Sequence, residues 1–371
     1  MNGDYLKKQI ITYMGNKRKL LGQINDIIDM VENELGYELI CADAFSGSGI
    51  VSRLLKTKSK KLYVNDIAGY SETLNKCYLD TPSPGKITQI KKYIDWANKI
   101  AHNFSKDIGE INWISRYWAP SGEITIKDRV FYTEENAILI DRYRHLINKI
   151  PNEYKHYLLA QLIVKASIHN NTNGQFSAFY KDENGIGKYG GKKEIDLKRI
   201  TGSIKLDYPI FSLKPCEIDI QKLNTNEWVK KIPEVDLIYL DPPYNKHPYS
   251  IYYFMLDIIN NWNTQQKIPN TNRGQPKNWN KSEYNSINKA LGAFKTLIQN
   301  INSKFILLSY NNKGIIPISE IETILKSKGK LYIFPLTHKT YNKMKGIAAY
   351  KRKEAWSDVK EFMWLVDTRK N

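Results

Sequence analysis

The stretch Val235-Asp236-Leu237-Ile238-Tyr239-Leu240-Asp241-Pro242-Pro243-Tyr244 carries the strongest signal for the fold. Its first six residues form a mostly apolar run that ends in a turn, which predicts a buried strand of an α/β sheet. In open α/β sheets, ligands bind at the carboxyl ends of the strands. An acidic residue, two rigid prolines and an aromatic ring at that edge offer hydrogen-bond acceptors and a π-face, without an obvious nucleophile. The segment therefore suggests chemistry on an exocyclic amino nitrogen of a nucleobase.

The composition limits the class of protein. The chain has 371 residues and a formal net charge of +18, with 56 Lys and Arg against 38 Asp and Glu. This length allows about two or three domains, and the positive excess favours a polyanionic partner, although a lysine-rich proteome would give the same excess. Cys41, Cys77 and Cys216 form no paired motif, which favours a reducing compartment. No apolar run is long enough for a membrane span and the first residues lack a signal-peptide core, so we expect a cytoplasmic protein with no membrane partner.

The order of the predicted elements indicates one interrupted sheet. The first part, residues 1–80, reads helix, strand, turn, helix, strand and helix, which predicts a parallel right-handed unit. A Pro- and Gly-rich break at 81–85 opens an insertion, 81–210, with helix-like stretches and little strand pattern. Strand patterns resume in 211–371. The expected helices are 17–35, 49–55, 70–79, 249–262, 287–299 and 319–325, where Ser319 and Glu322 have capping-box spacing, and the expected strands are 39–44, 61–65, 212–220, 235–240, 304–309, 330–334 and 361–366.

A glycine-containing loop follows the first predicted strand. The loop Asp43-Ala44-Phe45-Ser46-Gly47-Ser48-Gly49 precedes a predicted helix, so its glycines allow a ligand to approach the backbone and the helix start favours an anionic group. The alternative is a tight strand–helix turn without a ligand. Asp66 ends the next strand, where a carboxylate accepts hydrogen bonds from two ribose hydroxyls or serves only as a helix N-cap. Near the N-terminus, Tyr13-Met14-Gly15-Asn16-Lys17 contains a turn glycine and a lysine suited to an anion, although a lysine there is usually solvated.

These segments together resemble a known family. The order Tyr-x-Gly-x-Lys, Phe-x-Gly-x-Gly, Asn65-Asp66 and Asp-Pro-Pro-Tyr is similar to that of the D12 class of DNA adenine-N6 methyltransferases, which includes the Dam enzymes. The segments 245–253 and 308–314 also resemble family segments, and the resemblance covers about residues 10–80 and 210–340. Asp-Pro-Pro-Tyr alone also occurs in enzymes that methylate other amines, but the ordered set is more specific. One departure is Asn16, where Dam-type members often carry a second glycine.

The resemblance implies a Rossmann-like methyltransferase sheet with S-adenosylmethionine as methyl donor and no metal. It implies that Tyr13 and Lys17 contact the cofactor and that the loop from Phe45 to Gly49 wraps its methionine end. Asp66 would bind the ribose, and Asp219 with Ile220 would flank the adenine. The implied cofactor-binding residues are Tyr13, Lys17, Asp43, Phe45, Ser46, Gly47, Gly49, Asp66, Asp219, Ile220 and Asp241.

The implied catalytic residues are Asp241, Pro242 and Tyr244. The N6 lone pair of adenine is delocalised into the ring, so the amine is a poor nucleophile. The Asp241 carboxylate and the Pro242 carbonyl would each accept one N6–H, freeing the lone pair for direct transfer. Tyr244 would stack on the base, which must flip out of the duplex to be reached. The structural alternative for Asp241 is a strand-end turn with a side-chain hydrogen bond.

Target recognition is assigned to the insertion, as contacts to phosphates and base edges. The candidates are Arg116, Arg129, Arg142, Arg144, the loop 181–205, Asn170, Asn171, Asn173 and Gln175, although such side chains are commonly solvated or internal. A second basic stretch contains Lys339, Lys343, Lys345, Lys351, Arg352 and Lys353 and is either a phosphate clamp or a solvated face. We expect a site-specific methyltransferase on double-stranded DNA, in a prokaryotic restriction–modification system with a separate endonuclease or in a phage. The alternatives are an amino-methyltransferase on RNA or protein glutamine, and a catalytically silent nucleic-acid-binding module.

Overall fold

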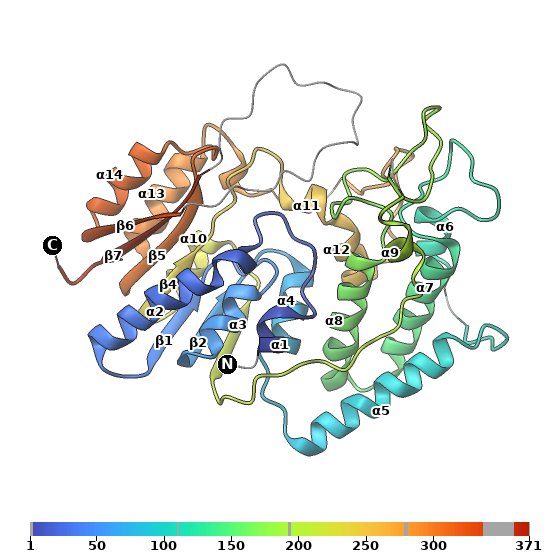
Figure 1. Cartoon of the computed structure of the whole chain (residues 1–371), viewed down its shortest axis with the longest axis horizontal. Coiled ribbons are helices and arrows are strands. Elements are labelled where there is room, and N and C mark those ends of the chain that lie inside the picture. Colours follow the sequence, from blue (N-terminus) through green and yellow to red (C-terminus); the bar gives the residue numbers. More distant parts are fainter. Residues whose placement is uncertain (1–2, 110, 192–193, 278–280, 337–359, 371) are drawn as a thin grey trace.

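The sheet has the predicted Rossmann-like architecture. The computed structural model describes residues 3–109, 111–191, 194–277, 281–336 and 360–370 (Figure 1). Within these ranges seven strands form one sheet in the order β3-β2-β1-β4-β5-β7-β6. The first five strands in the chain pair in parallel, and β7 lies antiparallel between β5 and β6. The strands are β1 (Leu39–Asp43), β2 (Ser59–Asn65), β3 (Glu217–Gln221), β4 (Val235–Leu240), β5 (Ser303–Asn311), β6 (Lys330–Leu336) and β7 (Glu361–Asp367).

The helices follow the predicted periodicity with local differences. The predicted helix 17–35 begins with a 3-10 turn, and the predicted helix 249–262 is divided at Tyr253. The helices are α1 (Gly3–Lys7), η1 (Lys17–Leu20), α2 (Leu21–Leu35), α3 (Ile50–Lys56), α4 (Gly69–Tyr78), α5 (Pro84–Ala101), α6 (Ile114–Trp118), α7 (Glu134–Lys149), α8 (Asn152–Ile168), α9 (Leu197–Thr201), α10 (Thr225–Trp228), α11 (Tyr249–Tyr252), α12 (Phe254–Asn261), η2 (Glu283–Asn285), α13 (Ala290–Asn300) and α14 (Ile318–Lys326). None of the helices in the described ranges has the length and apolarity needed to cross a membrane.

The predicted capping box at the start of α14 is wrong. The helix begins at Ile318, with Pro317 at the N-cap and no side-chain cap hydrogen bond, so Ser319 lies inside the helix. The restricted φ of proline starts the helix in place of a polar cap. Glu322 instead accepts a hydrogen bond of 3.2 Å from the indole of Trp364 on β7, which ties the helix to the sheet.

The strand order determines where a ligand-binding crevice lies. It reverses between β1 and β4, which are adjacent and parallel although the chain between them makes β2 and β3. Such a switch point opens a crevice at the carboxyl ends of the two strands. All six residues of β4 are buried, as its apolar run predicts for a central parallel strand. Asp43 ends β1 and Asp241 directly follows β4, so their side chains are held at this crevice.

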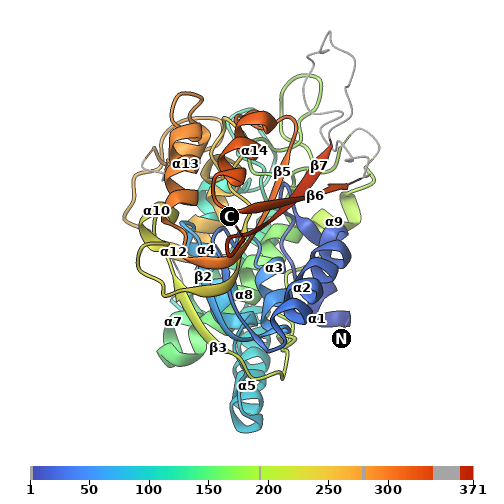
Figure 2. The same cartoon turned by 90° about the vertical axis from the view of Figure 1, so that its left-hand side faces the viewer.

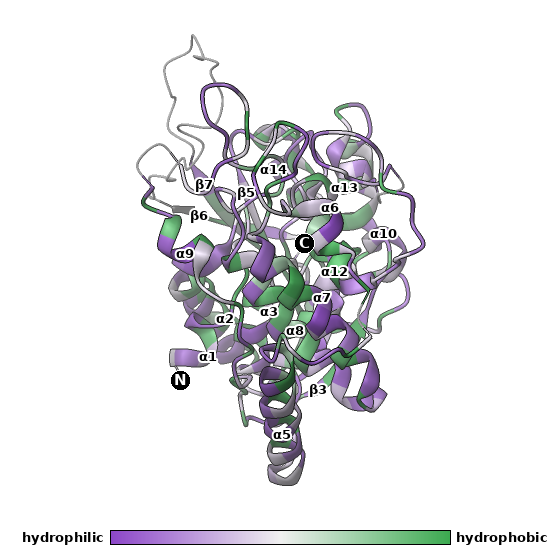
Figure 3. Cartoon of the chain, turned by 90° about the vertical axis from the view of Figure 1, so that its right-hand side faces the viewer, coloured by the Kyte–Doolittle hydropathy of each residue, from purple (hydrophilic) through white to green (hydrophobic). Residues whose placement is uncertain are grey.

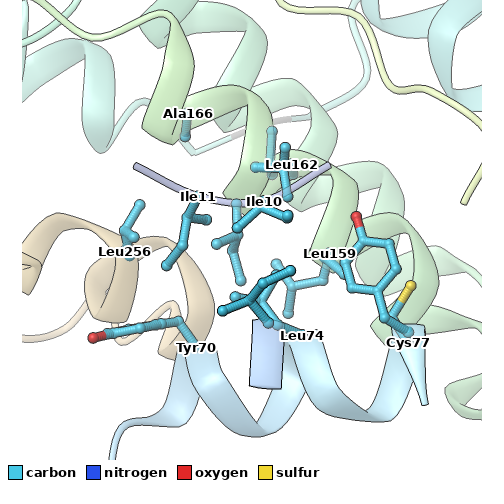
Figure 4. Close-up of a cluster of buried hydrophobic side chains, with 14 of the residues drawn as sticks. Ile10, Ile11, Tyr70, Leu74, Cys77, Leu159, Leu162, Ala166 and Leu256 are labelled. Carbon is cyan, nitrogen blue, oxygen red and sulfur yellow. The ribbon is translucent and has the colours of Figure 1, made fainter. Parts of the chain in front are cut away.

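The insertion shares its hydrophobic core with the sheet. Helix α8 packs against α4, and α12 contacts both. Figure 4 shows Leu74 and Cys77 of α4 meeting Leu159 and Leu162 of α8 next to Ile10 of the N-terminal segment. In Figure 3 hydrophobic stretches run along α8 and α3 in the middle of the molecule. Helix α5 extends away from the sheet (Figure 2).

A buried lysine joins the two ends of the insertion. Lys56 of α3 is fully buried, and its ammonium donates to the backbone carbonyls of Asp80 at 2.7 Å and Ser212 at 3.0 Å. Burial lowers the pKa of Lys56 to about 8. The chain therefore leaves the sheet and returns to it at one fixed point, while the boundaries 1–80, 81–210 and 211–371 remain a proposal.

We expect Leu74→Ala to lower the free energy of unfolding by about 2–5 kcal/mol, because it opens a cavity between α4 and α8. Urea denaturation followed by both far-ultraviolet circular dichroism and tryptophan fluorescence measures the change. Leu213→Ala is the matched control, since Leu213 is 69% exposed and should change stability by about 0.5 kcal/mol or less. Two separate transitions, only one of them moved by Leu74→Ala, would show that the insertion folds independently.

Candidate active site

A cavity lies at the carboxyl edge of the sheet. Its volume is about 430 Å³, within the range of small-molecule sites. The segments 13–17, 45–48 and 66–70 line it together with Asp241 and Pro243. The cavity thus brings together all of the segments that carry the sequence motifs.

The glycine loop and Asp66 form one hydrogen-bonded unit. The Gly47 amide donates to Asp66 Oδ2 at 2.7 Å, and the Ala68 amide donates to Asp66 Oδ1 at 2.9 Å. Burial raises the pKa of Asp66, and these backbone amides oppose that shift. A Cβ on Gly47 would lie 2.9 Å from the ring of Tyr13. The loop is therefore packed between Asp66 and Tyr13, and only glycine fits there.

Asp43 stabilises the glycine loop through hydrogen bonds of its carboxylate. Its carboxylate is fully buried and accepts hydrogen bonds from the Ser52 hydroxyl at 2.6 Å and the Phe45 amide at 3.3 Å. Burial raises the pKa of Asp43 to about 7. Phe45, Ser46 and Gly47 line the cavity, whereas Asp43 and Gly49 are absent from its described wall. The structure thus places Asp43 as a support for the loop.

Asp241 is paired with a buried lysine from the N-terminal segment. Lys17 Nζ lies 3.2 Å from Asp241 Oδ1 and 3.9 Å from Glu361 Oε2, and the Lys17 side chain is only 3% exposed. Burial raises the pKa of Asp241 to about 6, and the Lys17 ammonium limits that rise. Two carboxylates therefore share one cation, and Asp241 remains mainly ionised near neutral pH.

A group of tyrosines forms the wall between the N-terminal segment and α11–α12. The ring of Tyr13 stacks on those of Tyr253 at 4.6 Å and Tyr249 at 5.2 Å. The Met14 amide donates to the Tyr253 hydroxyl at 2.6 Å. These contacts hold the N-terminal segment over the cavity, and Tyr13 and Tyr249 both line it.

Tyr244 lies behind the cavity wall. Its side chain is buried, it meets Tyr310 edge-on at a ring distance of 5.9 Å, and the Lys17 ammonium lies 5.6 Å from its ring centre. Pro242 is also buried, whereas Pro243 lines the cavity. The half-buried Tyr249 also lines the cavity, and stacking of a base on Tyr244 stays a prediction.

The residues after β3 reach the cavity, whereas those within it do not. Asp219 and Ile220 lie inside β3 and are paired with Tyr63 and Val64 of β2. Neither belongs to the described cavity wall, to which Lys222, Asn224 and Thr225 contribute instead. The strand ends at Gln221, and in a parallel sheet the residues beyond the strand end face the ligand. Placing that strand end correctly would have identified Asn224 from the sequence.

A family comparison identifies the class of enzyme. The model of the D12 class N6 adenine-specific DNA methyltransferases matches residues 13–324, which include every motif that lines the cavity. The chain belongs to this family. It is therefore an adenine-specific DNA methyltransferase, and the resemblance read from the four motifs is confirmed.

Some relatives of this methyltransferase have about the same length as this chain, and others are about twice as long. The type II methyltransferase M.NlaIII of Neisseria lactamica is 26% identical over 363 residues, which is 96% of this chain and 99% of the relative. Type II methyltransferase M.CviAII of Paramecium bursaria Chlorella virus 1 is 25% identical over 96% of this chain and 98% of the relative. The modification methylase StsI of Streptococcus sanguinis is 29% identical over 93% of this chain, and the chain spans about half of that relative's length.

Several residues expected to read DNA have internal partners in this methyltransferase. Arg142 is buried and donates to the carbonyls of Ala101, Asn103 and Lys106. Arg144 is buried with its guanidinium 5.2 Å from the Trp262 ring. Both side chains are buried, and the Arg142 guanidinium is engaged by backbone carbonyls, so the prediction that they contact DNA is wrong for these two side chains.

The same correction applies to two asparagines of the insertion. Asn170 and Asn171 are buried, and their amides donate to backbone carbonyls, including that of Val130. Arg129 donates to the Thr271 and Pro269 carbonyls and thereby anchors the segment 264–277. Arg116 is exposed, and Asn173 and Gln175 are half-buried. The second basic stretch, Lys339 to Lys353, lies outside the described residues.

We expect Gly15→Ala to lower the rate of methyl transfer, because a Cβ there would lie 2.1 Å from the Tyr244 hydroxyl and displace a ring beside Lys17. Steady-state kinetics on methylatable DNA measure the effect. Gly36→Ala is the matched control: its φ of +74° is close to the +72° of Gly15, but its Cβ would meet nothing within 4 Å. Both variants should lose about 1 kcal/mol of stability from backbone strain, and equal activities would contradict the assigned role of Gly15.

Proposed function

We propose that this methyltransferase transfers the methyl group of S-adenosylmethionine to N6 of a flipped-out adenine in a specific double-stranded DNA sequence, as the modification enzyme of a restriction–modification system. The observation that carries the proposal is the buried Asp241–Lys17 pair, which lies at the switch point beside the glycine loop and Asp66. The restriction–modification role is supported by the type II relatives, and it implies a cognate endonuclease encoded separately.

The cavity residues fit S-adenosylmethionine. Asp66 would hold the ribose, the loop Phe45–Gly49 the methionine end, and Asn224 the adenine in place of Asp219 and Ile220. Tyr13 and Lys17 would close the site from the N-terminal side. The fit is supported by the close packing of Gly47 against Tyr13 and by the orientation of loop amides toward Asp66. When bound, the cofactor supplies an electrophilic methyl group on a sulfonium.

Asp241 prepares the target nitrogen. Lys17 lies at Oδ1, which leaves Oδ2 of the carboxylate available to accept an N6–H. The Pro242 carbonyl would accept the second hydrogen, so that the nitrogen becomes pyramidal and its lone pair points away from the ring. The carboxylate also stabilises the positive charge that develops on N6 as the new bond forms. Lys17 and Glu361 fix the carboxylate in position throughout.

The target adenine must leave the DNA stack to reach Asp241. The cavity wall near Asp241 offers Tyr249 as a stacking surface, and Tyr244 can contribute after a side-chain rearrangement. Extrusion of a base is the common solution for enzymes that modify bases within a duplex. The exposed Arg116 and the loop 181–205 remain candidates for contacts to the phosphates and bases.

Sequencing that detects modified bases, applied to host DNA after expression of the protein, tests the proposal. N6-methyladenine at one recurring sequence is the expected result. Modification confined to RNA or to protein glutamine would support the rival amino-methyltransferase, and unmodified DNA with intact DNA binding would support a silent binding module.

We expect Asp241→Asn to reduce the methylation rate by about a hundredfold or more, because the charge that stabilises N6 is lost. Binding of S-adenosylhomocysteine, measured by calorimetry, should be largely preserved. Asp236→Asn is a suitable control, since Asp236 lies on the same strand but pairs with Lys304 and the Ile40 amide away from the cavity. A fully active Asp241→Asn enzyme would falsify the mechanism.

We expect Lys17→Met to move the acid limb of the activity profile to higher pH. The active form of Asp241 is ionised, and its pKa of about 6 rises further when the ammonium is removed. Single-turnover rates between about pH 5 and pH 9 measure the shift. Lys17→Arg retains the charge and should keep the acid limb close to that of the wild type, whereas an unmoved limb in Lys17→Met would show that Lys17 does not control the carboxylate.

A further inference from the structure

Asp257 is a cavity residue to which no role has been assigned. It lies on α12, lines the cavity, and its Oδ1 is shielded from solvent without a hydrogen-bond partner among the described residues. Burial raises the pKa of Asp257 to about 7, while the amides of Gly69 and Tyr70 favour its charged form. A buried acceptor without a partner is costly, so a carboxylate left in this state indicates a ligand that completes it.

Asp257 and Asp66 lie side by side at the start of one helix. Asp66 accepts from the amide of Ala68, and Asp257 interacts with the next two amides, those of Gly69 and Tyr70. Ala68 is the N-cap of α4 and offers no side-chain cap. Three consecutive amides are thus distributed over two carboxylates from different parts of the chain.

Capping of α4 explains only part of the geometry of Asp257. The Gly69 and Tyr70 amides favour the charged form of the carboxyl group, whereas its Oδ1 has no hydrogen-bond partner among the described residues. Asp141 provides a comparison, because it is a helix-capping aspartate outside the cavity wall. It accepts from the amides of Ile114 and Ser115 and from the Ser115 hydroxyl, so both of its oxygens are engaged, and it lies outside the cavity wall.

We infer that Asp257 is a second ribose-binding carboxylate, which accepts a hydrogen bond from one of the two cofactor hydroxyls while Asp66 accepts from the other. The inference rests on the proposed cofactor site. A ribose presents two adjacent O–H donors, and Asp66 and Asp257, which lie beside consecutive amides at the start of α4, offer one acceptor to each. Both oxygens of Asp66 already accept a backbone amide, whereas Oδ1 of Asp257 has no hydrogen-bond partner among the described residues.

Calorimetric titration with S-adenosylhomocysteine and with its 2′-deoxy and 3′-deoxy analogues tests this assignment without catalysis. Asp257→Asn should weaken the binding of S-adenosylhomocysteine by about tenfold to a hundredfold, the range for a hydrogen bond to a charged group. One of the two deoxy analogues should bind the wild type correspondingly less tightly, and this penalty should nearly vanish in Asp257→Asn. The penalty for the other analogue should persist.

Asp141→Asn is the matched control, because it removes the charge of a buried helix-capping carboxylate that does not line the cavity. It should leave the affinity and both deoxy penalties unchanged, although its melting temperature falls. If Asp257→Asn does not fold, Asp257→Glu replaces it, since it keeps the carboxylate charge but moves the oxygens by one methylene group.

Each other outcome has a distinct meaning. Wild-type affinity in Asp257→Asn, or weaker affinity with both deoxy penalties intact, overturns the role of Asp257 and leaves the cofactor site standing. Equal binding of all three ligands by the wild type overturns the ribose assignment. A wild-type enzyme that binds none of the ligands overturns the proposed cofactor site and, with it, the inference.

Discussion

The buried ion pair between Asp241 and Lys17 is the interaction on which the rest of the site depends. Two charges at the bottom of a cavity are costly to desolvate, and removing one partner leaves the other uncompensated. Three parts of the chain supply the charged groups: Asp241 directly follows β4, Lys17 belongs to the N-terminal segment, and Glu361 belongs to β7. The tyrosine stack and the Met14–Tyr253 hydrogen bond then hold the segment that carries Lys17. A mobile N-terminus would leave the carboxylate without its cation, and its pKa would rise toward the working pH.

The second half of the cavity is built on backbone amides. Gly47, Ala68 and the first residues of α4 direct their N–H groups toward Asp66 and Asp257. Burial raises the pKa of both carboxyl groups, and these amides oppose that rise by favouring the charged forms. The cavity therefore has a side rich in hydrogen-bond acceptors, suited to the hydroxyl donors of a nucleoside, and a charge-balanced side at Asp241 and Lys17. The switch point of the sheet brings both sides to one edge.

Local sequence patterns were sufficient to predict the central strand β4 and the loops that carry the motifs. The apolar run before Asp241, the glycine loop and Asp66 each depend on neighbours in the sequence, so strand periodicity and turn chemistry located them. Asp257 and Glu361 depend on contacts between distant elements, which a single sequence does not display. Asn224 was missed because β3 ends one residue later than the pattern indicated. Arg142 and Asn171 were assigned to DNA because their residue types suit it, yet the same donors serve equally well to satisfy buried carbonyls.

The insertion shares its hydrophobic core with the elements that line the cavity. Trp113, within the insertion, lines the cavity together with Phe254 and Asp257 of α12, and α12 packs against both α4 and α8. The wall that holds the proposed ribose carboxylate is therefore supported from the insertion side as well as from the sheet. Residues of the insertion that contact DNA would lie on the same rigid body as this wall, because a close-packed core transmits displacement. The proposed DNA contacts of the insertion and the proposed cofactor site would thus be linked through the packing of α8 and α12, which an appended recognition module on a flexible linker would not achieve.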